Sequence, residues 1–565
     1  MSFTAPVSDQ RLVLNAVVGI GELPGGPDAE TVDAVLEGAA ALAEGEFAPL
    51  LRVGDIIGAR WDGGAQPVPQ TGEHRHGAVT MPEGFKSAWR SFVDGGWMSL
   101  AAPEEHGGQG LPFVLSAALM DDLNAANVGF ALCPMLSMGA IEALERHGSD
   151  ELKRDYLPKI VSGEWPATMN LTEPAAGSDV GALKTRAEPV GDGSWKIRGT
   201  KIFITYGEHD LSDQIIHMVL ARTPGAPEGT RGISLFLVPK ILPDGTRNDL
   251  RCVSIEHKLG IHASPTCVMS YGDHDGAIGW LVGPENGGMA AMFTMMINAR
   301  LNVGLQGVGI AERATQRAVA YALERKQGQR NRLPVPISEH PDVRRMLLRM
   351  RALTMGARAL TYYAFGQVDH ALRGDAGAGL RAQVLTPLVK AWGTDVGIEV
   401  ANLGIQVHGG MGYIEETGAA QHLRDARIAS IYEGTNGIQA ADLVGRKLGL
   451  DGGLAFDELI ADIEAETRDP RLVALVDAVE VAATSLREAA PDDRLAGSYP
   501  FLTMCSVMVA GWLVERMAAS EGADERTRAA ANYFLTAIVP EALGLGAAAE
   551  AGAALLYQVP AEALA

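Results

Sequence analysis

The strongest constraint on the fold is a block of strand-like sequence that interrupts an otherwise helical chain. Residues 1 to about 164 carry apolar side chains at helical spacing, with a long helical stretch over roughly 113–147. From about 165 the pattern alternates and is rich in β-branched residues, and turn signals separate the predicted strands. These strands are 195–205, 215–222, 233–239 and 266–271. The sequence therefore predicts a β domain inserted between helical domains.

The changes of pattern divide the chain into four predicted domains. They are an N-terminal helical domain at 1–164, a middle β domain at 165–282, a helical bundle at 283–450 and an additional helical domain at 451–565. Gly- and Pro-rich loops are predicted at 61–72 and 102–112, and a further loop at 327–342. The predicted fold class is mainly α with this β insertion.

Composition narrows the possible partners. The formal net charge of -22 over 565 residues argues against nucleic acid and against anionic membrane surfaces. The four cysteines are far apart and no metal-ligand spacing occurs, so neither a disulfide framework nor a metal site is expected. We expect a reducing, cytoplasmic location. The apolar run 502–514 is too short to span a bilayer and predicts a buried helix, and the N-terminus does not resemble a signal peptide.

The run 431–439, with the sequence IYEGTNGIQ, is the most informative short motif. It places Glu433 at a glycine-containing break between a predicted helix at 421–430 and a second helix, for which Asn436 and Gln439 form a start signal. A carboxylate at such a junction can point into a cleft while its backbone is fixed on both sides. Taken alone, a solvated loop acid is the commoner explanation.

Three further motifs lie at the borders of the predicted β domain or in the bundle. The loop 169–179 offers hydroxyls and backbone N–H groups to a heterocycle or a phosphate, although an ordinary turn has the same composition. The strand end 203–207 places an aromatic ring before a hydroxyl and a glycine, a pattern that is more often core. The glycines of 406–413 permit close approach of a ligand, and a plain helix–helix turn fits equally well.

Together and in this order, the motifs TEPAAGSDV, FITYGE, ALERK, QVHGGMGY and IYEGTNGIQ resemble the acyl-CoA dehydrogenase family over about 75–450. The resemblance implies a helical domain, a middle β-barrel and a C-terminal four-helix bundle. The start of the chain and the tail after 451 resemble extended members, most of all the subfamily of 3-methylmercaptopropionyl-CoA dehydrogenases and their paralogues. A homodimer is then expected, because in extended members the tail covers a surface otherwise used for tetramers.

The family oxidises an acyl-CoA to the trans-2-enoyl-CoA, with a carboxylate removing the α-proton and FAD accepting a hydride from the β-carbon. The resemblance implies 3-methylmercaptopropionyl-CoA or a fatty acyl-CoA as substrate, a place in fatty acid metabolism, and an electron-transferring flavoprotein as acceptor. It makes Glu433 the base. The implied FAD contacts are Leu171, Thr172, Gly177, Ser178, Phe203, Ile204, Thr205, Arg325, Gln406, Gly409, Gly410 and Thr435. The implied substrate contacts are Ser178, Arg300, Tyr432 and Gly434.

These contacts are not all made within one subunit. Arg325, Gln406, Gly409 and Gly410 match residues that reach the FAD of the neighbouring subunit. Phe203 stands where many members have Trp, which keeps an aromatic surface of smaller area. Two other functions remain compatible with the sequence. An acyl-CoA oxidase on the same scaffold would reoxidise in air with formation of peroxide, and a non-catalytic helical scaffold protein would take up no FAD.

Overall fold

The structure is a computed structural model that describes residues 3–63 and 77–565. The chain forms two compact units. The bundle unit comprises Met1–Ala40, Pro112–Ala125 and Arg300–Ala565, and the sheet unit comprises Ala41–Leu111 and Ala126–Ala299. Most of the predicted loop 61–72 lies outside the described residues. Each unit is described by itself.

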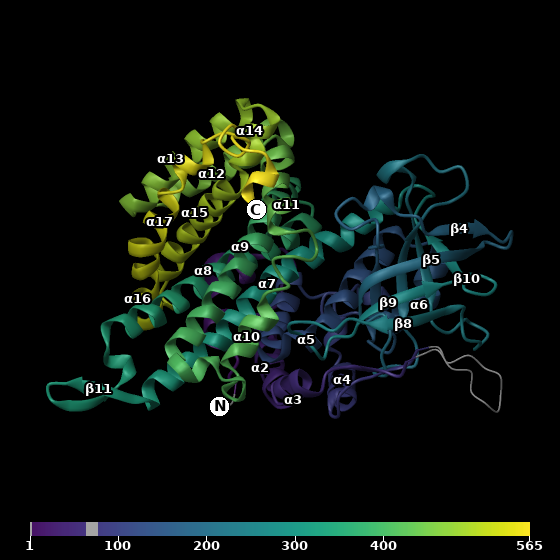
Figure 1. Cartoon of the computed structure of the whole chain (residues 1–565), viewed down its shortest axis with the longest axis horizontal. Helices are drawn as coiled ribbons and strands as arrows, with labels where there is room; N and C mark the ends of the chain where they lie inside the picture. Colours follow the sequence, from purple (N-terminus) through teal and green to yellow (C-terminus); the bar gives the residue numbers. More distant parts are fainter. Residues whose placement is uncertain (1–2, 64–76) are drawn as a thin grey trace. The chain divides into compact units, whose positions relative to one another are not determined.

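The sheet unit contains an eight-stranded sheet (Figure 1). Its strands are β3 (Ala167–Asn170), β4 (Arg186–Pro189), β5 (Ser194–Thr205), β6 (Ile216–Ala221), β7 (Ser234–Pro239), β8 (Leu250–Ile255), β9 (Thr266–Tyr271) and β10 (Ala277–Val282). The order is β3-β6-β7-β10-β5-β9-β8, and β4 pairs with β5. Every pairing is antiparallel except that of β3 with β6. Buried side chains of these strands, among them Val219, Phe236 and Tyr271, form a hydrophobic core.

Helices and one short hairpin complete this unit. They are α3 (Leu50–Ile57), β1 (Arg60–Trp61), β2 (Val79–Thr80), α4 (Phe85–Asp94) and α6 (Asp150–Val161). Two long helices, α5 (Phe113–His147) and α7 (Gly288–Glu324), contribute residues to both units. The helical path of α5 breaks at Asn127, whose φ of -162° and ψ of 86° are not helical.

The bundle unit is built on long helices. They are α1 (Val7–Val13), α2 (Ala29–Leu42), α8 (Pro341–Leu372), α9 (Ala376–His408), α10 (Ala419–Ala426) and α11 (Asn436–Asp442), together with parts of α5 and α7. Arg358 of α8, which is buried, bonds Asp121 of α5 at 2.7 Å and Glu312 of α7 at 3.1 Å. A buried pair of this kind is destabilising to break, so it fixes the position of α7, which carries Arg300.

The chain after α11 adds a set of mostly short helices to the bundle unit, drawn in light green and yellow in Figure 1. They are α12 (Leu454–Glu466), α13 (Pro470–Glu488), α14 (Pro491–Ala496), α15 (Ser498–Ala519), α16 (Glu525–Tyr533), α17 (Val539–Leu543) and α18 (Gly546–Ala549). Among the described helices, α5 and α15 are long and apolar enough to cross a membrane. However, 89% and 78% of their most apolar windows are buried, as in core helices of a folded domain.

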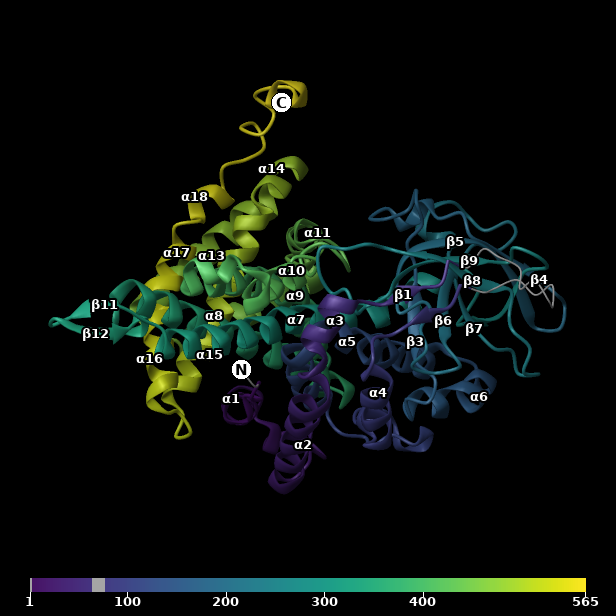
Figure 2. The same ribbon diagram turned by 60° about the horizontal axis from the view of Figure 1, so that its bottom comes forward.

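Most of the predicted elements are present. The helix at 113–147, the four predicted strands and the buried helix over 502–514 are confirmed by α5, by β5, β6, β7 and β9, and by α15. The sequence pattern missed β3 and β4, which have four residues each, and also β8 and β10, which have six. The loop prediction for 327–342 is wrong, because β11 (Lys326–Arg330) and β12 (Leu333–Pro336) form a hairpin there that projects from the bundle unit in Figures 1 and 2. Nearly all of its residues are exposed, so no burial pattern marked it.

Candidate active site

The loop between α10 and α11 carries Glu433 in an unusual backbone conformation. Glu433 has a φ of 55° and Gly434 a φ of 84°, so two consecutive residues are left-handed. For a residue other than glycine this conformation costs about 1–2 kcal/mol, and such strain persists only where the surroundings enforce it. A Cβ at Gly434 would lie 2.8 Å from the Gln439 amide nitrogen, so a side chain there would displace Gln439 as well as strain the backbone.

Neighbouring groups hold this strained loop closed. The Asn436 N–H donates to the carbonyl oxygen of Ser430 at 3.1 Å. Arg300 of α7 donates from Nε to the carbonyl oxygen of Glu433 at 3.3 Å, and Gln439 of α11 donates to that of Gly434 at 3.3 Å. The Tyr432 hydroxyl bonds Gln306 of α7. The loop is therefore fixed from both α7 and α11. Of the predicted substrate contacts, Arg300 bonds the Glu433 carbonyl, and Tyr432 and Gly434 are the chain neighbours of Glu433.

The start of α11 differs from the prediction. The N-cap is Thr435, whose hydroxyl accepts from the Ile438 N–H at 3.2 Å, and Asn436 is the first helical residue. The Asn436 side chain instead bonds α9, accepting from Lys390 Nζ at 2.9 Å and donating to Asp395 at 2.8 Å. The predicted helix 421–430 is also shorter, because α10 ends at Ala426 and the chain turns there. The error at the cap arises because an Asn side chain can bond a distant helix as well as its own.

The surroundings of the Glu433 carboxyl favour a base. Burial raises its pKa, while the charges of Arg300 and Lys390 lower it. Among the described residues it accepts no hydrogen bond and has no cation within 4.0 Å, so those charges act from a distance. Burial lowers the pKa of Lys390 to about 7 against the attraction of Glu433 and Asp395. A carboxylate with a raised pKa and no fixed donor is a stronger base than one in water.

A second group at this position is also open. Within the described part of the chain, the backbone N–H of Glu433 donates to no protein acceptor. In the left-handed conformation of this loop, a free N–H can stabilise the oxyanion that develops when an α-proton leaves a thioester. The loop thus offers a base and an anion-binding donor from one residue.

The predicted flavin segment lies in the sheet unit and is also strained. The pairing of β5 with β9 shifts between Lys201 and Ile204, and Phe203 at this irregularity has a φ of 60°. The bulge turns the Phe203 ring outward, where 58% of the residue is exposed. Ile204 points the opposite way into the core at 2% exposure, so only its backbone could contact a ligand. An exposed aromatic ring on a rigid strand can accept a flat heterocycle.

A buried ion pair fixes the adjoining loop. Lys201 of β5, which is fully buried, bonds Glu173 at 2.8 Å and the carbonyl oxygen of Leu171 at 3.0 Å. Glu173 also accepts from the N–H groups of Lys184 and Thr185. Burial lowers the pKa of Lys201 to about 8 despite this partner, whereas Lys201 and these donors together hold the pKa of Glu173 below its usual value. The two members of this pair are 28 residues apart in the sequence, so no local pattern indicates it.

The polar groups of this segment fit a flavin. The hydroxyls of Thr172, Ser178 and Thr205 bond no protein group in 3–63 or 77–565, and all three residues are at least partly exposed. A side chain at Gly177 would meet nothing within 4 Å, which leaves room for a ligand against the backbone. The Thr172 carbonyl accepts from the Ile202 N–H at 2.9 Å, and this bond ties the loop to β5. An aromatic ring beside unbonded hydroxyls is a donor set that suits the isoalloxazine ring of FAD.

The residues predicted to serve a neighbouring subunit are all exposed in the bundle unit. They are Arg325, Gln406, Gly409 and Gly410. Tyr321 of α7 stacks on His408 of α9 with ring centroids 4.4 Å apart, and this contact brings the end of α7 to the end of α9. The residues predicted to reach a neighbour's FAD are thus gathered at one end of the bundle. Thr435 is exposed too, although its hydroxyl is used as the N-cap.

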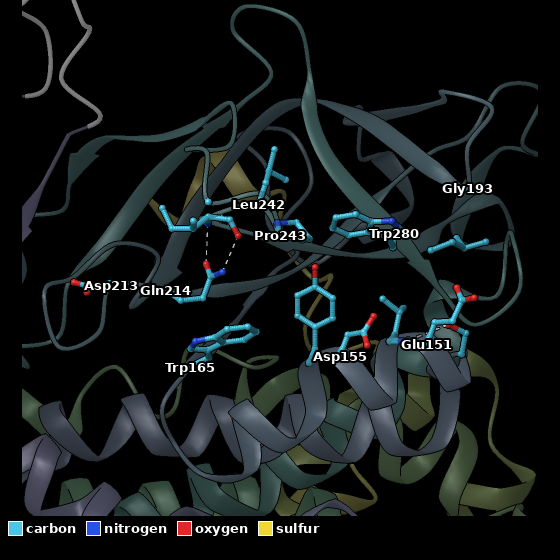
Figure 3. A pocket seen from close by; sticks show the side chains of 15 residues that line it. Glu151, Asp155, Trp165, Gly193, Asp213, Gln214, Leu242, Pro243 and Trp280 are labelled. Carbon is cyan, nitrogen blue, oxygen red and sulfur yellow. Dashed lines mark hydrogen bonds between the residues drawn. The ribbon is translucent and has the colours of Figure 1, made fainter.

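A separate cleft of about 610 Å³ lies in the sheet unit, where α6 faces the loops of the sheet (Figure 3). Glu151, Asp155, Trp165 and Trp280 are among its lining residues, and Gln214 is bonded to the backbone of Ile241. None of the predicted FAD or substrate residues lines this cleft. The volume of this cleft therefore does not by itself identify a catalytic site.

Models of known protein families match four consecutive segments of the chain. Models of the N-terminal, middle and C-terminal domains of acyl-CoA dehydrogenase match residues 65–164, 168–273 and 286–448. A model described as acetyl-CoA dehydrogenase C-terminal like matches residues 457–560. The chain resembles these models along most of its length, including the additional helical domain.

Individual proteins resemble it over nearly their whole length. A protein of Ruegeria pomeroyi named 3-methylmercaptopropionyl-CoA dehydrogenase is 48% identical, over 91% of this chain and 90% of that protein. A Mycobacterium tuberculosis protein named broad-specificity linear acyl-CoA dehydrogenase is 34% identical, over 92% and 90%. The solved structure of a Bacillus anthracis acyl-CoA dehydrogenase complexed with FAD has the same fold, with a TM-score of 0.75 at 22% identity, over 100% and 94%.

Proposed function

Because the chain belongs to the acyl-CoA dehydrogenase family, and is therefore an FAD-dependent oxidoreductase acting on CH–CH bonds, we propose that Glu433 is its catalytic base. The proposal depends on the state of its carboxyl group. Burial raises the pKa of this group, and no described residue donates a hydrogen bond to it. In this role the carboxylate takes the α-proton of the acyl-CoA. The electron pair of that C–H bond forms the Cα–Cβ double bond.

The other residues act by position and charge. The Glu433 N–H donates to the thioester oxygen as negative charge develops on it, and Arg300 holds the loop through the Glu433 carbonyl. When bound, FAD would supply the acceptor for the hydride that the β-carbon loses. Its ring would be held by Leu171, Thr172, Gly177, Ser178, Phe203, Ile204 and Thr205. The unbonded hydroxyls and the outward Phe203 ring of that segment support this assignment.

The base assignment is tested by Glu433→Gln. The amide keeps the shape of the side chain but cannot take a proton, so we expect flavin reduction by acyl-CoA to slow by about 10²–10⁴-fold. The purified variant should stay yellow and bind acyl-CoA. In the wild type the reduction rate should rise with pH through the raised pKa of Glu433, because only the ionised form acts. Stopped-flow reduction within a few-fold of wild type would remove Glu433 from this role.

We further propose 3-methylmercaptopropionyl-CoA as the preferred substrate, in place of a straight-chain fatty acyl-CoA. The support is that the 48% identical relative carries that substrate in its name, whereas the relative named for linear acyl-CoAs is 34% identical. Pentanoyl-CoA is the matched control, since it replaces the sulfur by a methylene. A kcat/KM for the thioether several-fold above that for pentanoyl-CoA supports the proposal. Equal or reversed values indicate a fatty acyl-CoA substrate and a role in fatty acid metabolism.

A homodimer is also proposed. Exposed apolar side chains surround the segments predicted to reach a neighbour's FAD, and they are Leu323, Leu333, Met411, Tyr413 and Ile414. Tyr413, which is 86% exposed, belongs to this group, and a group of exposed apolar side chains marks an interaction surface. Tyr413→Glu should shift the mass measured by light scattering to that of a monomer and release FAD. Tyr557→Glu, at a residue 73% exposed near the C-terminus, is the control.

The acceptor and the location complete the proposal. We propose that electrons pass to an electron-transferring flavoprotein in the cytoplasm, and the four free, buried cysteines are in keeping with a reducing compartment. In air, with an electron-transferring flavoprotein and a dye as the added acceptors, the rate of dye reduction should exceed the rate of oxygen consumption. Stoichiometric peroxide would instead identify an oxidase, and recovery of the protein outside the cytoplasm would refute the location.

A further inference from the structure

The additional helical domain reaches the helix that supports the catalytic loop. Tyr499 of α15 donates its hydroxyl to Asp395 Oδ2 of α9 at 2.6 Å. Tyr499 is 39% exposed, so it lies at the edge of the domain and contributes more through its hydroxyl than through packing.

Asp395 connects Tyr499 to the loop, because its carboxylate accepts hydrogen bonds from both. Its Oδ1 accepts from the Asn436 side chain at 2.8 Å, and Asn436 is only 4% exposed. The backbone N–H of the same asparagine closes the loop on Ser430 at 3.1 Å. Burial raises the pKa of Asp395, and its bonds to Tyr499 and Asn436 oppose that rise. The tyrosine therefore stabilises the ionised carboxylate that anchors Asn436.

The same asparagine also positions a charge that acts on the base. Asn436 Oδ1 accepts from Lys390 Nζ at 2.9 Å, and Lys390 is fully buried. The Lys390 ammonium is one of the two cations whose charge acts on Glu433. A shift of Asn436 would thus change both the backbone of the loop and the field at the carboxylate.

A second polar contact between the additional domain and α9 provides a comparison. Asp462 of α12 bonds Arg381, near the start of α9. Arg381 and Asp395 are separated by roughly 21 Å along the helix, at 1.5 Å per residue. No hydrogen bond links Arg381 to a described residue of the catalytic loop. The two contacts join the same domain to the same helix, and they differ in their connection to the base.

From this chain of contacts we infer that the additional helical domain positions the catalytic loop through Tyr499, Asp395 and Asn436. Tyr499 is then a positioning residue, which touches neither substrate nor cofactor. The inference rests on the proposed role of Glu433. It assigns to the additional domain a part in the reaction beyond covering a surface.

The test uses full-length, FAD-loaded Tyr499→Phe, with Asp462→Asn as the matched control. We expect Tyr499→Phe to slow flavin reduction at saturating acyl-CoA by about 3–10-fold, the range for one hydrogen bond, with little change in substrate Kd. The acid limb of the pH profile should move to higher pH, because a displaced Lys390 lowers the pKa of Glu433 less. Amides of 430–438 should exchange hydrogen faster. Asp462→Asn should change none of these.

The route of action is tested in the Asp395→Asn background. If Tyr499 acts through Asp395, Tyr499→Phe should add nothing to the loss already caused by Asp395→Asn. Additive effects, or a Tyr499→Phe variant that matches Asp462→Asn in rate, pH profile and exchange, would overturn the inference. Glu433→Gln in the same assay reports separately on the base. The exchange measurement does not depend on that role, so the two failures can be told apart.

Discussion

The two loops predicted to carry the chemistry both hold a non-glycine residue in the left-handed region, and they are held by different kinds of structure. Phe203 is part of β5, a strand bonded along its length to neighbouring strands, and its loop is anchored by the buried Lys201–Glu173 pair. Glu433 lies between two helices and is held by several separate side-chain bonds from Arg300, Gln439 and Asn436.

The difference suggests different mechanical roles. A strand with a buried ion pair gives a rigid surface against which a flat cofactor can lie, and its failure is all-or-none. A helix junction held by separate bonds of about 1 kcal/mol each can adjust in small steps. We therefore expect substitutions in the first loop to release FAD, and substitutions in the second to alter rates while FAD remains bound.

The largest expected effect is in the sheet unit. Lys201→Met keeps most of the side-chain volume but leaves the Glu173 carboxylate buried without its cation. We expect the free energy of unfolding in urea to fall by about 3–5 kcal/mol, with loss of the flavin absorbance. Lys196→Met is the control, because Lys196 is on the same strand and its ion pair with Asp275 is exposed, and it should cost less than about 1 kcal/mol. Retention of FAD by Lys201→Met would show that the ion pair does not hold the loop.

The next effect concerns the base loop. Asn436→Ala removes the acceptor of Lys390 and the donor to Asp395, both in a buried setting. We expect a loss of about 1–3 kcal/mol of stability and slower flavin reduction, while the FAD content stays at that of the wild type. Asn402→Ala, at an exposed residue of α9, should behave as wild type. Release of FAD by Asn436→Ala would erase the contrast between the two loops.

Helix caps give a finer comparison. Thr435→Ala removes the N-cap of α11, and Ser149→Ala removes that of α6 in the sheet unit. Each should cost about 1 kcal/mol in thermal or urea unfolding, and Thr435→Ser should restore most of the loss. Only the Thr435 variant is expected to slow flavin reduction as well, since its cap adjoins Glu433. Equal kinetics in both alanine variants would mean that the cap has no link to the base.

The smallest expected effect is a gain in stability. Because burial raises the pKa of Glu433, the folded chain retains a proton that the unfolded chain has released between the two pKa values. Folding is therefore penalised as pH rises through that window. The charges of Arg300 and Lys390 offset part of the penalty. Glu433→Gln should raise the midpoint of thermal unfolding at pH 8 and leave it unchanged near pH 4, and a lower midpoint at pH 8 would contradict the raised pKa.

Prediction from sequence succeeded where local pattern determines structure. The period of 113–147 and the alternation of 195–205 identified α5 and β5, and the motif around Glu433 identified a glycine-containing junction between helices. The pattern failed at the hairpin over 326–336, where exposed residues carry no alternation of burial, and at the cap of α11, where Asn436 bonds α9 instead of its own helix.

The sequence by itself determined the family, the order of helical and β segments, and which residue types could serve as base and flavin contacts, because these follow from local periodicity and short motifs. Only the tertiary structure decided that Lys390, Asp395 and Tyr499 stand behind the base loop and that Lys201 pairs with Glu173. The physical reason is that side-chain bonds between distant segments depend on where helices and strands pack. The local sequence around each residue does not determine that packing.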